Sequence, residues 1–217
     1  MKKLKAGAKL PPEFYLQETS QLARALLGKR LVRVGVDGLR RSGLIVETEA
    51  YLGIRDAACH THQGRQTPRV KSMYLEGGHA YIYLIYGMHY CFNVVAMGAG
   101  EPEAVLIRAL DPDPENFAPP ARTDGPGRLC KALGITKELD GASLQGPGIF
   151  IEQVFEQDSH APAKDQISEA PRIGVAYAGE AAAWNLRFYW RGNPFVSVKE
   201  KGWKKGSPLI RPSGPTT

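Results

Sequence analysis

Cysteine is scarce in this sequence, and its spacing argues against two common ways of stabilising a fold. Only three of the 217 residues are cysteines, Cys59, Cys91 and Cys130. Their number is odd, they lie far apart and no Cys-x-x-Cys pair occurs, so neither a disulfide framework nor a cysteine zinc site is indicated. This usage is typical of a reducing compartment, and we expect the protein to be cytoplasmic.

Long hydrophobic segments are also missing. No run approaches the roughly 18 apolar residues of a membrane-spanning helix, and the lysines near the N-terminus are not followed by the apolar stretch of a secretion signal. We therefore expect neither secretion nor a membrane partner. Internal repeats, heptads, a Gly-x-Gly-x-x-Gly before a helix, a Walker A loop and a Gly-x-Ser-x-Gly motif are absent as well.

What the chain does contain is typical of a globular protein with a basic surface. Hydrophobic residues make up 43% of the 217 residues, enough for one full-sized core. The 28 lysines and arginines outnumber the 22 acidic residues and give a formal net charge of +6, which is compatible with a polyanionic partner. We predict a single domain over residues 1–217, with residues 1–12 and 205–217 as flexible tails.

The hydrophobic pattern predicts an α+β fold. Segments rich in β-branched and aromatic residues, bounded by Gly, Pro and Asp, indicate strands, and leucines at helical spacing indicate short helices. We expect a curved, mostly antiparallel sheet with flanking short helices and a protruding β-hairpin that turns at Gly87. The predicted strands are 31–36, 43–50, 80–96, 104–110, 149–155, 173–178 and 186–190. The predicted helices are 19–27, which Thr19 or Ser20 can cap, and 127–133, which Gly134 closes. The predicted loops are 61–72, 111–126 and 156–170.

Two carboxylates share one face of the predicted strand at 43–50. Side chains alternate along an extended backbone, so Glu47 and Glu49 are expected on the same face as Ile45. Glu49 lies where the strand ends before Leu52-Gly53, and strand ends that lead into loops commonly present reactive side chains. A carboxylate there can act as a general base, although a strand face exposed to water would give the same pattern.

Aromatic residues and a cationic loop follow this strand. Tyr81 and Tyr83 share a face of the next strand, where aromatic side chains usually pack in the core. Tyr86 and Met88 lie at the predicted turn with little to pack against, and are candidates for insertion between the bases of a nucleic acid. The polar, basic loop at 61–72 can contact phosphates, and a loop that is simply solvated explains its composition as well.

Arg108 and two histidines leave further chemistries open. Arg108 interrupts an apolar strand and needs a carboxylate, a phosphate or water as its partner. Cys59, His60 and His62 offer metal ligands, but their spacing fits one site poorly and no His-Glu-x-x-His motif supports it. A nucleophilic Cys-His pair is less favoured still, because adjacent residues seldom face each other. A metal-dependent hydrolase that uses His60 and His62 is therefore one alternative.

Taken together, the residues indicate a protein that holds a base pulled out of a nucleic acid. Stacking aromatic side chains combined with cationic loops suit this task, and a strand-end carboxylate in such a pocket could deprotonate water. A non-catalytic nucleic-acid-binding domain would use the same aromatic residues and basic loops.

Seven segments, in order, resemble the alkyladenine (3-methyladenine) DNA glycosylase family. The likeness spans roughly residues 15–198. The segments are VETEAYLG at 46–53, GRQTPR at 64–69, YIYLIYGMHYCFN at 81–93, LIRAL at 106–110, LCKAL at 129–133, PRIGV at 171–175 and LRFY at 186–189.

The resemblance implies an enzyme of base-excision repair that hydrolyses the N-glycosidic bond of alkylated purines, without metal or organic cofactor. Glu49 matches the general base that activates the attacking water, and Arg108 matches a residue that helps to hold this water. Tyr51, His60 and Tyr83 match the pocket that sandwiches the flipped base.

The remaining carried-over positions concern DNA. Tyr86 matches the residue that fills the space vacated in the duplex, and Asn93 matches a pocket residue that screens bases by their exocyclic groups. Met88, Arg65 and Arg69 complete the set of residues that we expect to contact DNA.

The resemblance also implies how the enzyme acts and on what. No lysine matches a catalytic position, so we expect a monofunctional enzyme that does not cleave the strand. The expected partner is double-stranded DNA with alkylated or deaminated purines, the expected state is a monomer, and a bacterial source would place it at the nucleoid. Two positions depart from the family: His89, where an aromatic residue such as Tyr is familiar, and Cys59, where Ala is familiar.

Overall fold

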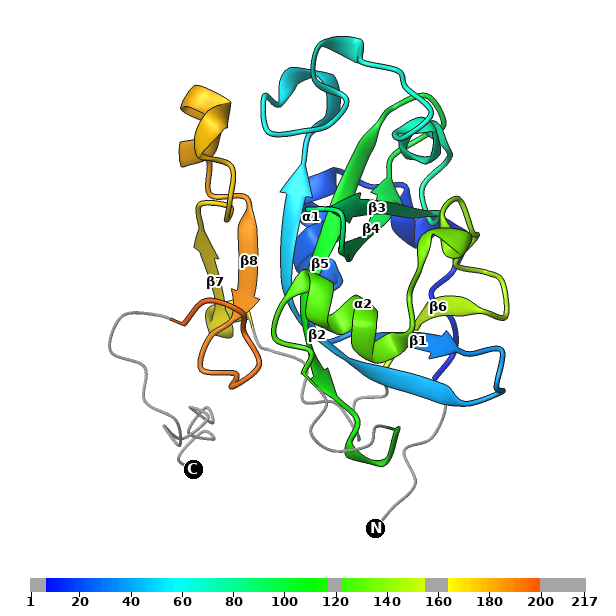
Figure 1. Cartoon of the computed structure of the whole chain (residues 1–217). Coiled ribbons are helices and arrows are strands. Elements are labelled where there is room, and N and C mark those ends of the chain that lie inside the picture. The colour runs from blue at the N-terminus through cyan, green and yellow to red at the C-terminus, as the bar shows by residue number, and fades with distance from the viewer. Residues whose placement is uncertain (1–6, 117–121, 155–163, 200–217) are drawn as a thin grey trace.

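The strand β2 (Arg40–Tyr51) is the centre of the sheet (Figure 1). Its first half pairs with β1 (Arg30–Val34), its second half pairs with β8 (Arg187–Trp190), and β5 (Glu103–Pro112) pairs with it along the opposite edge. This computed structural model describes residues 7–116, 122–154 and 164–199, and every strand pairing in it is antiparallel.

The eight strands of the described residues belong to one sheet, in the order β3-β4-β5-β2-β1-β6, with β8 paired to β2 and to β7. This arrangement confirms the predicted α+β class, with an antiparallel sheet and short helices. The other elements are β3 (Ala80–Ile85), β4 (His89–Ala96), β6 (Ile149–Glu152), β7 (Ile167–Ala170), the α-helices α1 (Thr19–Ala25) and α2 (Pro126–Leu133), and the 3-10 segments η1 (Pro12–Tyr15), η2 (Gly53–Arg55), η3 (His62–Gly64), η4 (Lys71–Tyr74), η5 (Pro114–Asn116), η6 (Lys137–Leu139), η7 (Lys164–Gln166) and η8 (Ala176–Ala183).

Both α-helices contribute to the same core. Leu22 of α1, Leu26 at its C-terminal cap and Leu129 of α2 pack in one cluster with Phe92 of β4 and Ile107 of β5, and all five are fully buried. Burying five large apolar side chains contributes roughly 1.5–3 kcal/mol each relative to exposure. The predicted helices at 19–27 and 127–133 are thus confirmed, because their apolar faces have a sheet to cover.

The helix ends follow local chemistry. The side chain of Glu18 accepts a hydrogen bond from the backbone N–H of Gln21 and caps α1, whereas we expected Thr19 or Ser20 to do so. Gly134 ends α2 with a left-handed φ of 67°, which confirms its predicted role.

The pairing of β2 with β5 is irregular at the carboxylates. Ile45 lies opposite Leu110, Glu47 opposite Ala109 and Thr48 opposite Ile107. Val46 on β2 and Arg108 on β5 therefore have no partner in the pairing of these two strands. Such an irregularity re-aims side chains. Ile45 therefore packs in the main core, while Glu47 bonds to Arg108. The expectation that Ile45 shares a face with Glu47 and Glu49 is wrong for this reason.

Residues 173–178 do not form the predicted strand. Gly174 has a left-handed φ of 78° and ends any extended run, and the 3-10 segment η8 begins at Ala176. Ile173 and Val175 line a pocket instead of pairing. The strand β7 falls within the predicted loop at 156–170, of which residues 156–163 lie outside the described residues.

Part of the predicted N-terminal tail is held against the sheet. Lys9 forms an isolated bridge with Glu152, and the N–H of Leu10 donates to the carbonyl of Ile151 at 2.9 Å. Leu10 is only 2% exposed, so Lys9 and Leu10 of the predicted tail pack against β6. The rest of that tail, 1–6, and the predicted tail at 205–217 lie outside the described residues.

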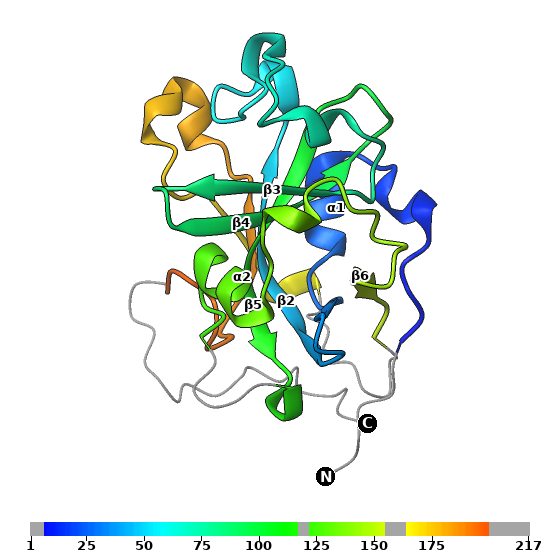
Figure 2. The ribbon, with the colours of Figure 1, turned by 45° about the vertical axis from the view of Figure 1, so that its right-hand side comes forward.

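The strands β3 and β4 run side by side and are joined by Tyr86, Gly87 and Met88 (Figure 2). Tyr86 and Gly87 both have positive φ, 53° and 70°, and the N–H of Met88 donates to the carbonyl of Ile85 at 3.2 Å. These are the features of a type I′ turn, which matches the twist of two antiparallel strands. A non-glycine residue in this conformation costs roughly 1–2 kcal/mol, so Tyr86 occupies this position against its backbone preference.

Candidate active site

A pocket of about 350 Å³ opens beside the C-terminal end of β2. Its volume lies within the range of small-ligand sites, roughly 300–1,000 Å³. Its walls come from β2, β3, β4, β5 and the loops around residues 58–60 and 173–177. Six of the predicted site residues line it: Tyr51, His60, Tyr83, Tyr86, Asn93 and Arg108.

Glu49 lies behind this wall and has no exposed surface. Its Oε2 accepts hydrogen bonds from the Tyr51 hydroxyl at 2.9 Å and from Arg108 Nη1 at 3.2 Å. Its Oε1 accepts one from the backbone N–H of Ile173 at 2.7 Å. All three donors belong to residues that line the pocket. The alternative of a strand face exposed to water is therefore wrong.

These bonds do not use every acceptor position of Glu49. A carboxylate offers about four acceptor positions, two on each oxygen. The donors from the described residues use two positions on Oε2 and one on Oε1 of Glu49. One acceptor position of Oε1 is thus not used by any donor from the described residues.

Arg108 connects Glu49 with a second buried carboxylate. Its Nε lies 3.2 Å from Oε1 of Glu47, and Arg187 Nη1 donates to the same oxygen at 2.9 Å. The backbone N–H of Ser197 donates to the other oxygen of Glu47 at 2.6 Å. Buried charges are tolerated when they are paired and hydrogen-bonded in this way. The partner that Arg108 needs is therefore a pair of carboxylates.

The aromatic side chains of the pocket hold one another edge to face. The rings of His60 and Tyr83 lie 4.6 Å apart at an interplanar angle of 82°. Nδ1 of His60 is hydrogen-bonded to the Tyr81 hydroxyl at 2.8 Å, which fixes the imidazole. Tyr81 was expected in the core, and it is buried there at 2% exposure while it orients His60.

The protonation states suit a cationic ligand. Burial, aided by the positive charges of Arg69 and Arg65, lowers the pKa of His60 to about 4. The imidazole is therefore neutral near pH 7 and does not repel a positively charged ring. Burial, together with the charge of Glu49, raises the pKa of Tyr51 well above its usual value, so its hydroxyl remains a donor.

Asn93 presents an amide to the pocket from β4. It is 3% exposed, and its Nδ2 donates to the carbonyl of Tyr81 at 2.9 Å. This bond fixes the amide plane. The Asn93 side chain can therefore hydrogen-bond the polar edge of a bound ring in one fixed orientation.

The predicted DNA-contacting residues lie at or beside the mouth. Tyr86 is 83% exposed and lines the pocket, and Met88 is 70% exposed beside it in the turn, outside the pocket lining. Arg69 places its guanidinium 5.4 Å from the Tyr83 ring centroid and donates to the carbonyl of Leu84 at 3.2 Å. Arg65 is also exposed and, like Arg69, does not line the pocket.

Comparison with known proteins assigns the family. The model of the family described as methylpurine-DNA glycosylase matches residues 13–194. The chain belongs to the methylpurine-DNA glycosylase family. It is thus a DNA glycosylase for alkylated bases, as the resemblance of its motifs implied.

Individual relatives cover nearly the whole of this glycosylase. The three relatives described here are each named "Putative 3-methyladenine DNA glycosylase". The relative from Bdellovibrio bacteriovorus is 49% identical over 193 residues, which cover 88% of this chain and 99% of the relative. Those from Bacillus cereus and Bacillus thuringiensis are 47% and 46% identical over 204 residues, which cover 87% of this chain and 98% of each relative.

The structure adds residues that the sequence did not single out. The amide of Ile173 bonds to Glu49, and Tyr177 of η8 lines the pocket while 71% exposed. A backbone N–H leaves no signature in the residue types. The signal that the sequence does contain is Gly174, because a glycine within an apolar run can adopt the left-handed φ that bends the chain. Gly174 has this conformation.

The metal and nucleophile alternatives find no support in the geometry. Among residues 7–116, 122–154 and 164–199, no three His, Cys, Asp or Glu side chains are grouped to hold a metal ion. His62 Nδ1 lies 3.1 Å from the carbonyl of Ile54, and His60 faces Tyr81. Burial raises the pKa of Cys59, which disfavours a thiolate.

Every helix in the described part of this glycosylase is too short or too polar to span a lipid bilayer.

Proposed function

We propose that this glycosylase flips a damaged purine out of duplex DNA into the pocket beside Glu49 and hydrolyses its N-glycosidic bond. The observation that carries the proposal is the placement of Glu49, a fully buried carboxylate held by three residues that line a pocket of ligand size. The proposed substrates are alkylated and deaminated purines, and the proposed active species is a monomer.

In the proposed reaction, Glu49 is the general base. As the C1′–N bond breaks, its electron pair leaves with the purine and the sugar becomes oxocarbenium-like, which a nearby carboxylate stabilises. The free acceptor position on Oε1 takes a proton from a water molecule, and the oxygen of this water forms the new bond to C1′. Arg108 and Tyr51 hold Oε2 of Glu49 throughout, so that Oε1 stays directed at the water.

Base recognition is assigned to the aromatic walls. Alkylation puts positive charge on the purine, which weakens its bond to the sugar and favours contact with electron-rich rings. Tyr51, Tyr83 and the neutral His60 provide such rings without opposing charge. Asn93, with its amide plane fixed by Tyr81, screens bases by their exocyclic groups.

The duplex is engaged at the mouth of the pocket. Tyr86 fills the space that the flipped base leaves, with Met88 beside it, and offsets part of the few kcal/mol that unstacking costs. The type I′ turn holds Tyr86 in position before DNA binds, which reduces the ordering cost. Arg65 and Arg69 contact phosphates beside the lesion.

The enzyme is proposed to need no metal or organic cofactor and to leave the strand uncut. Strand cleavage coupled to base release requires an amine that attacks the sugar, and among the described residues that line the pocket there is no lysine. The proposed product is therefore an abasic site in an intact strand.

The proposal is tested by incubating the purified protein with methylated duplex DNA in the presence of a chelator. We expect free methylated purine in the supernatant and strand breaks only after alkali treatment. Binding of the DNA without base release would instead indicate a non-catalytic binding domain, and release abolished by the chelator would indicate a metal-dependent hydrolase.

A further inference from the structure

Asp56 and Arg172 form an ion pair whose side chains have no exposed surface. Arg172 Nη2 donates to one carboxylate oxygen of Asp56 at 2.8 Å, and Nη1 donates to the other. The same guanidinium donates to the carbonyls of Ala50 at 3.0 Å and Ala181 at 3.1 Å. One side chain thus ties the end of β2, the loop that follows it and η8 to one another.

The Asp56 end of the pair organises the loop that carries His60. Its carboxylate accepts hydrogen bonds from the N–H groups of Leu52 at 3.0 Å and Ala58 at 2.9 Å. Its backbone carbonyl accepts one from Cys59 at 2.8 Å, directly before His60. The course of the chain from the end of β2 to the pocket histidine is therefore set around Asp56.

The Arg172 end lies next to two of the three donors of Glu49. The guanidinium stacks over the ring of Tyr51 at 4.8 Å, and Tyr51 donates to Oε2. The next residue is Ile173, whose N–H donates to Oε1. Neither Asp56 nor Arg172 lines the pocket itself, so any influence on a bound base acts through these neighbours.

We propose that Asp56 and Arg172 are positioning residues that hold the Tyr51 hydroxyl and the Ile173 amide against Glu49 and thereby aim its carboxylate. The inference rests on the proposed role of Glu49 as the general base. An error of about 1 Å at a reacting group can cost on the order of a hundredfold in rate. The fork of an arginine fixes geometry in a way that the single ammonium of lysine cannot.

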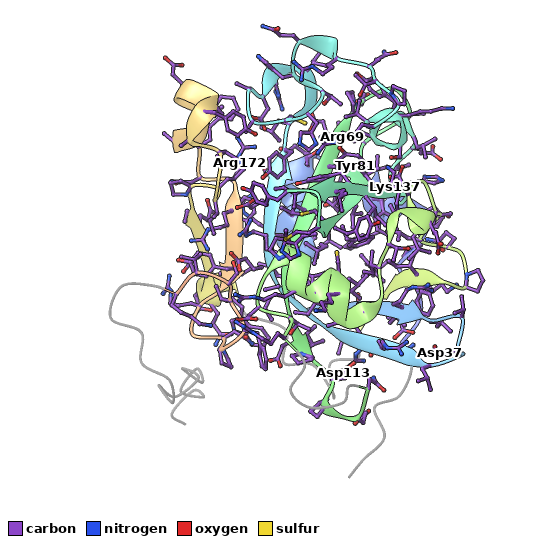
Figure 3. All side chains as sticks on the ribbon, in the orientation of Figure 1. Asp37, Arg69, Tyr81, Asp113, Lys137 and Arg172 are labelled. Atoms are coloured by element: carbon purple, nitrogen blue, oxygen red, sulfur yellow. The ribbon has the colours of Figure 1, made fainter. Side chains whose placement is uncertain are left out.

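A buried ion pair can also serve only to stabilise the fold, and the chain offers a matched control for this case. Arg30 and Asp113 form an ion pair at 3.0 Å with side chains 4% and 7% exposed, and Asp113 also accepts from the Ser42 hydroxyl. Asp113 contacts Ser42 near the start of β2, whereas Arg172 contacts Ala50 near its end, and the two residues lie far apart in Figure 3. Asp113→Asn should therefore lose comparable stability without touching the site.

The experiment compares the full-length wild type with Asp56→Asn, Arg172→Lys and Asp113→Asn. For each, we measure thermal unfolding, the dissociation constant for a labelled duplex with one methylated base, and single-turnover base release well below the lowest Tm. We expect Asp56→Asn and Arg172→Lys to slow release at least about tenfold, with a dissociation constant within a few fold of the wild type. Asp113→Asn should have a similarly lowered Tm and release bases about as fast as the wild type.

The outcomes separate this inference from the proposed function. Release by the wild type and equal release by Asp56→Asn and Asp113→Asn would overturn the inference alone. If Asp56→Asn does not fold, Arg172→Lys decides by the same comparison, and failure of both to fold would show that the pair serves the fold and would overturn the inference. No release by the wild type would overturn the proposed function, and the inference with it.

Discussion

The hydroxyl of Tyr51 donates a hydrogen bond of 2.9 Å to Oε2 of Glu49, two residues earlier on the same strand. The alternation of side chains along β2 makes this contact possible, because residues i and i+2 share a face. Hydrogen bonds to charged groups contribute roughly 1.5–3 kcal/mol. We predict that Tyr51→Phe, which keeps the ring, slows single-turnover base release by about tenfold to a hundredfold while binding to damaged DNA persists. An unchanged rate would show that the hydroxyl does not orient Glu49.

Stability should depend on pH through His60. Its pKa is about 4 in the folded protein and about 6.5 in an unfolded chain. Between these values the unfolded state binds the additional proton, so stability is complete above about pH 6.5 and falls as the pH falls toward 4. We predict that His60 accounts for a loss of about 2 kcal/mol in the free energy of unfolding between pH 7 and pH 5.

Denaturant titrations of the wild type and His60→Gln at the two pH values test this. Glutamine does not titrate, so the variant should lose less stability over the same interval. Equal losses in the two proteins would mean that His60 is as easily protonated in the folded state as in the unfolded one.

Glu47 should matter more for stability than an exposed carboxylate. Its carboxylate is fully buried and accepts from Arg108, Arg187 and the Ser197 amide. Removing one partner from a buried ion pair typically costs about 3–5 kcal/mol. We predict a loss of this order in the free energy of unfolding for Glu47→Gln.

The control is Glu169→Gln, since the Glu169 side chain is 46% exposed and pairs with Arg24 at the surface. Exposed pairs contribute about 0–1 kcal/mol. Similar losses for the two variants in denaturant titrations would contradict the view that the buried charges depend on one another.

Tyr86 should act only when there is a duplex to open. We predict that Tyr86→Ser weakens capture of the flipped base and slows release from duplex DNA, but leaves release from single-stranded DNA nearly unchanged. The control is Val36→Ser in the β1–β2 turn, because Val36 is also a fully exposed apolar turn residue. Equal slowing with duplex and single-stranded DNA would show that Tyr86 contributes to binding the base and does not fill the space that the base leaves in the duplex.

Much of the sheet could be predicted from the sequence, because local patterns determine it. Periodicity located β2, β5 and β8, and glycines at 87 and 134 marked a turn and a helix end. The motifs then indicated which residues meet: Tyr51, His60, Tyr83, Asn93 and Arg108 come from separate elements and line one pocket.

The remainder depends on contacts between distant parts of the chain. The register irregularity near Arg108 arises from two strands together, and strict alternation on one strand could not reveal it. The Ile173 amide reaches Glu49 from 124 residues away, and Arg172 reaches Asp56 from 116 residues away. No local pattern encodes such pairings, so the support around the general base became visible only in the folded chain.

The most direct test of the role of Glu49 measures base release from methylated duplex DNA with chelator present. It compares the wild type, Glu49→Gln and Glu47→Gln at a temperature where all three are folded. Both substitutions remove one negative charge from the same buried network, but only Glu49 adjoins the pocket through its three donors. The account predicts release by the wild type, slower release by Glu47→Gln and none by Glu49→Gln, which should still bind damaged DNA within a few fold. Release by folded Glu49→Gln at the rate of Glu47→Gln would contradict it.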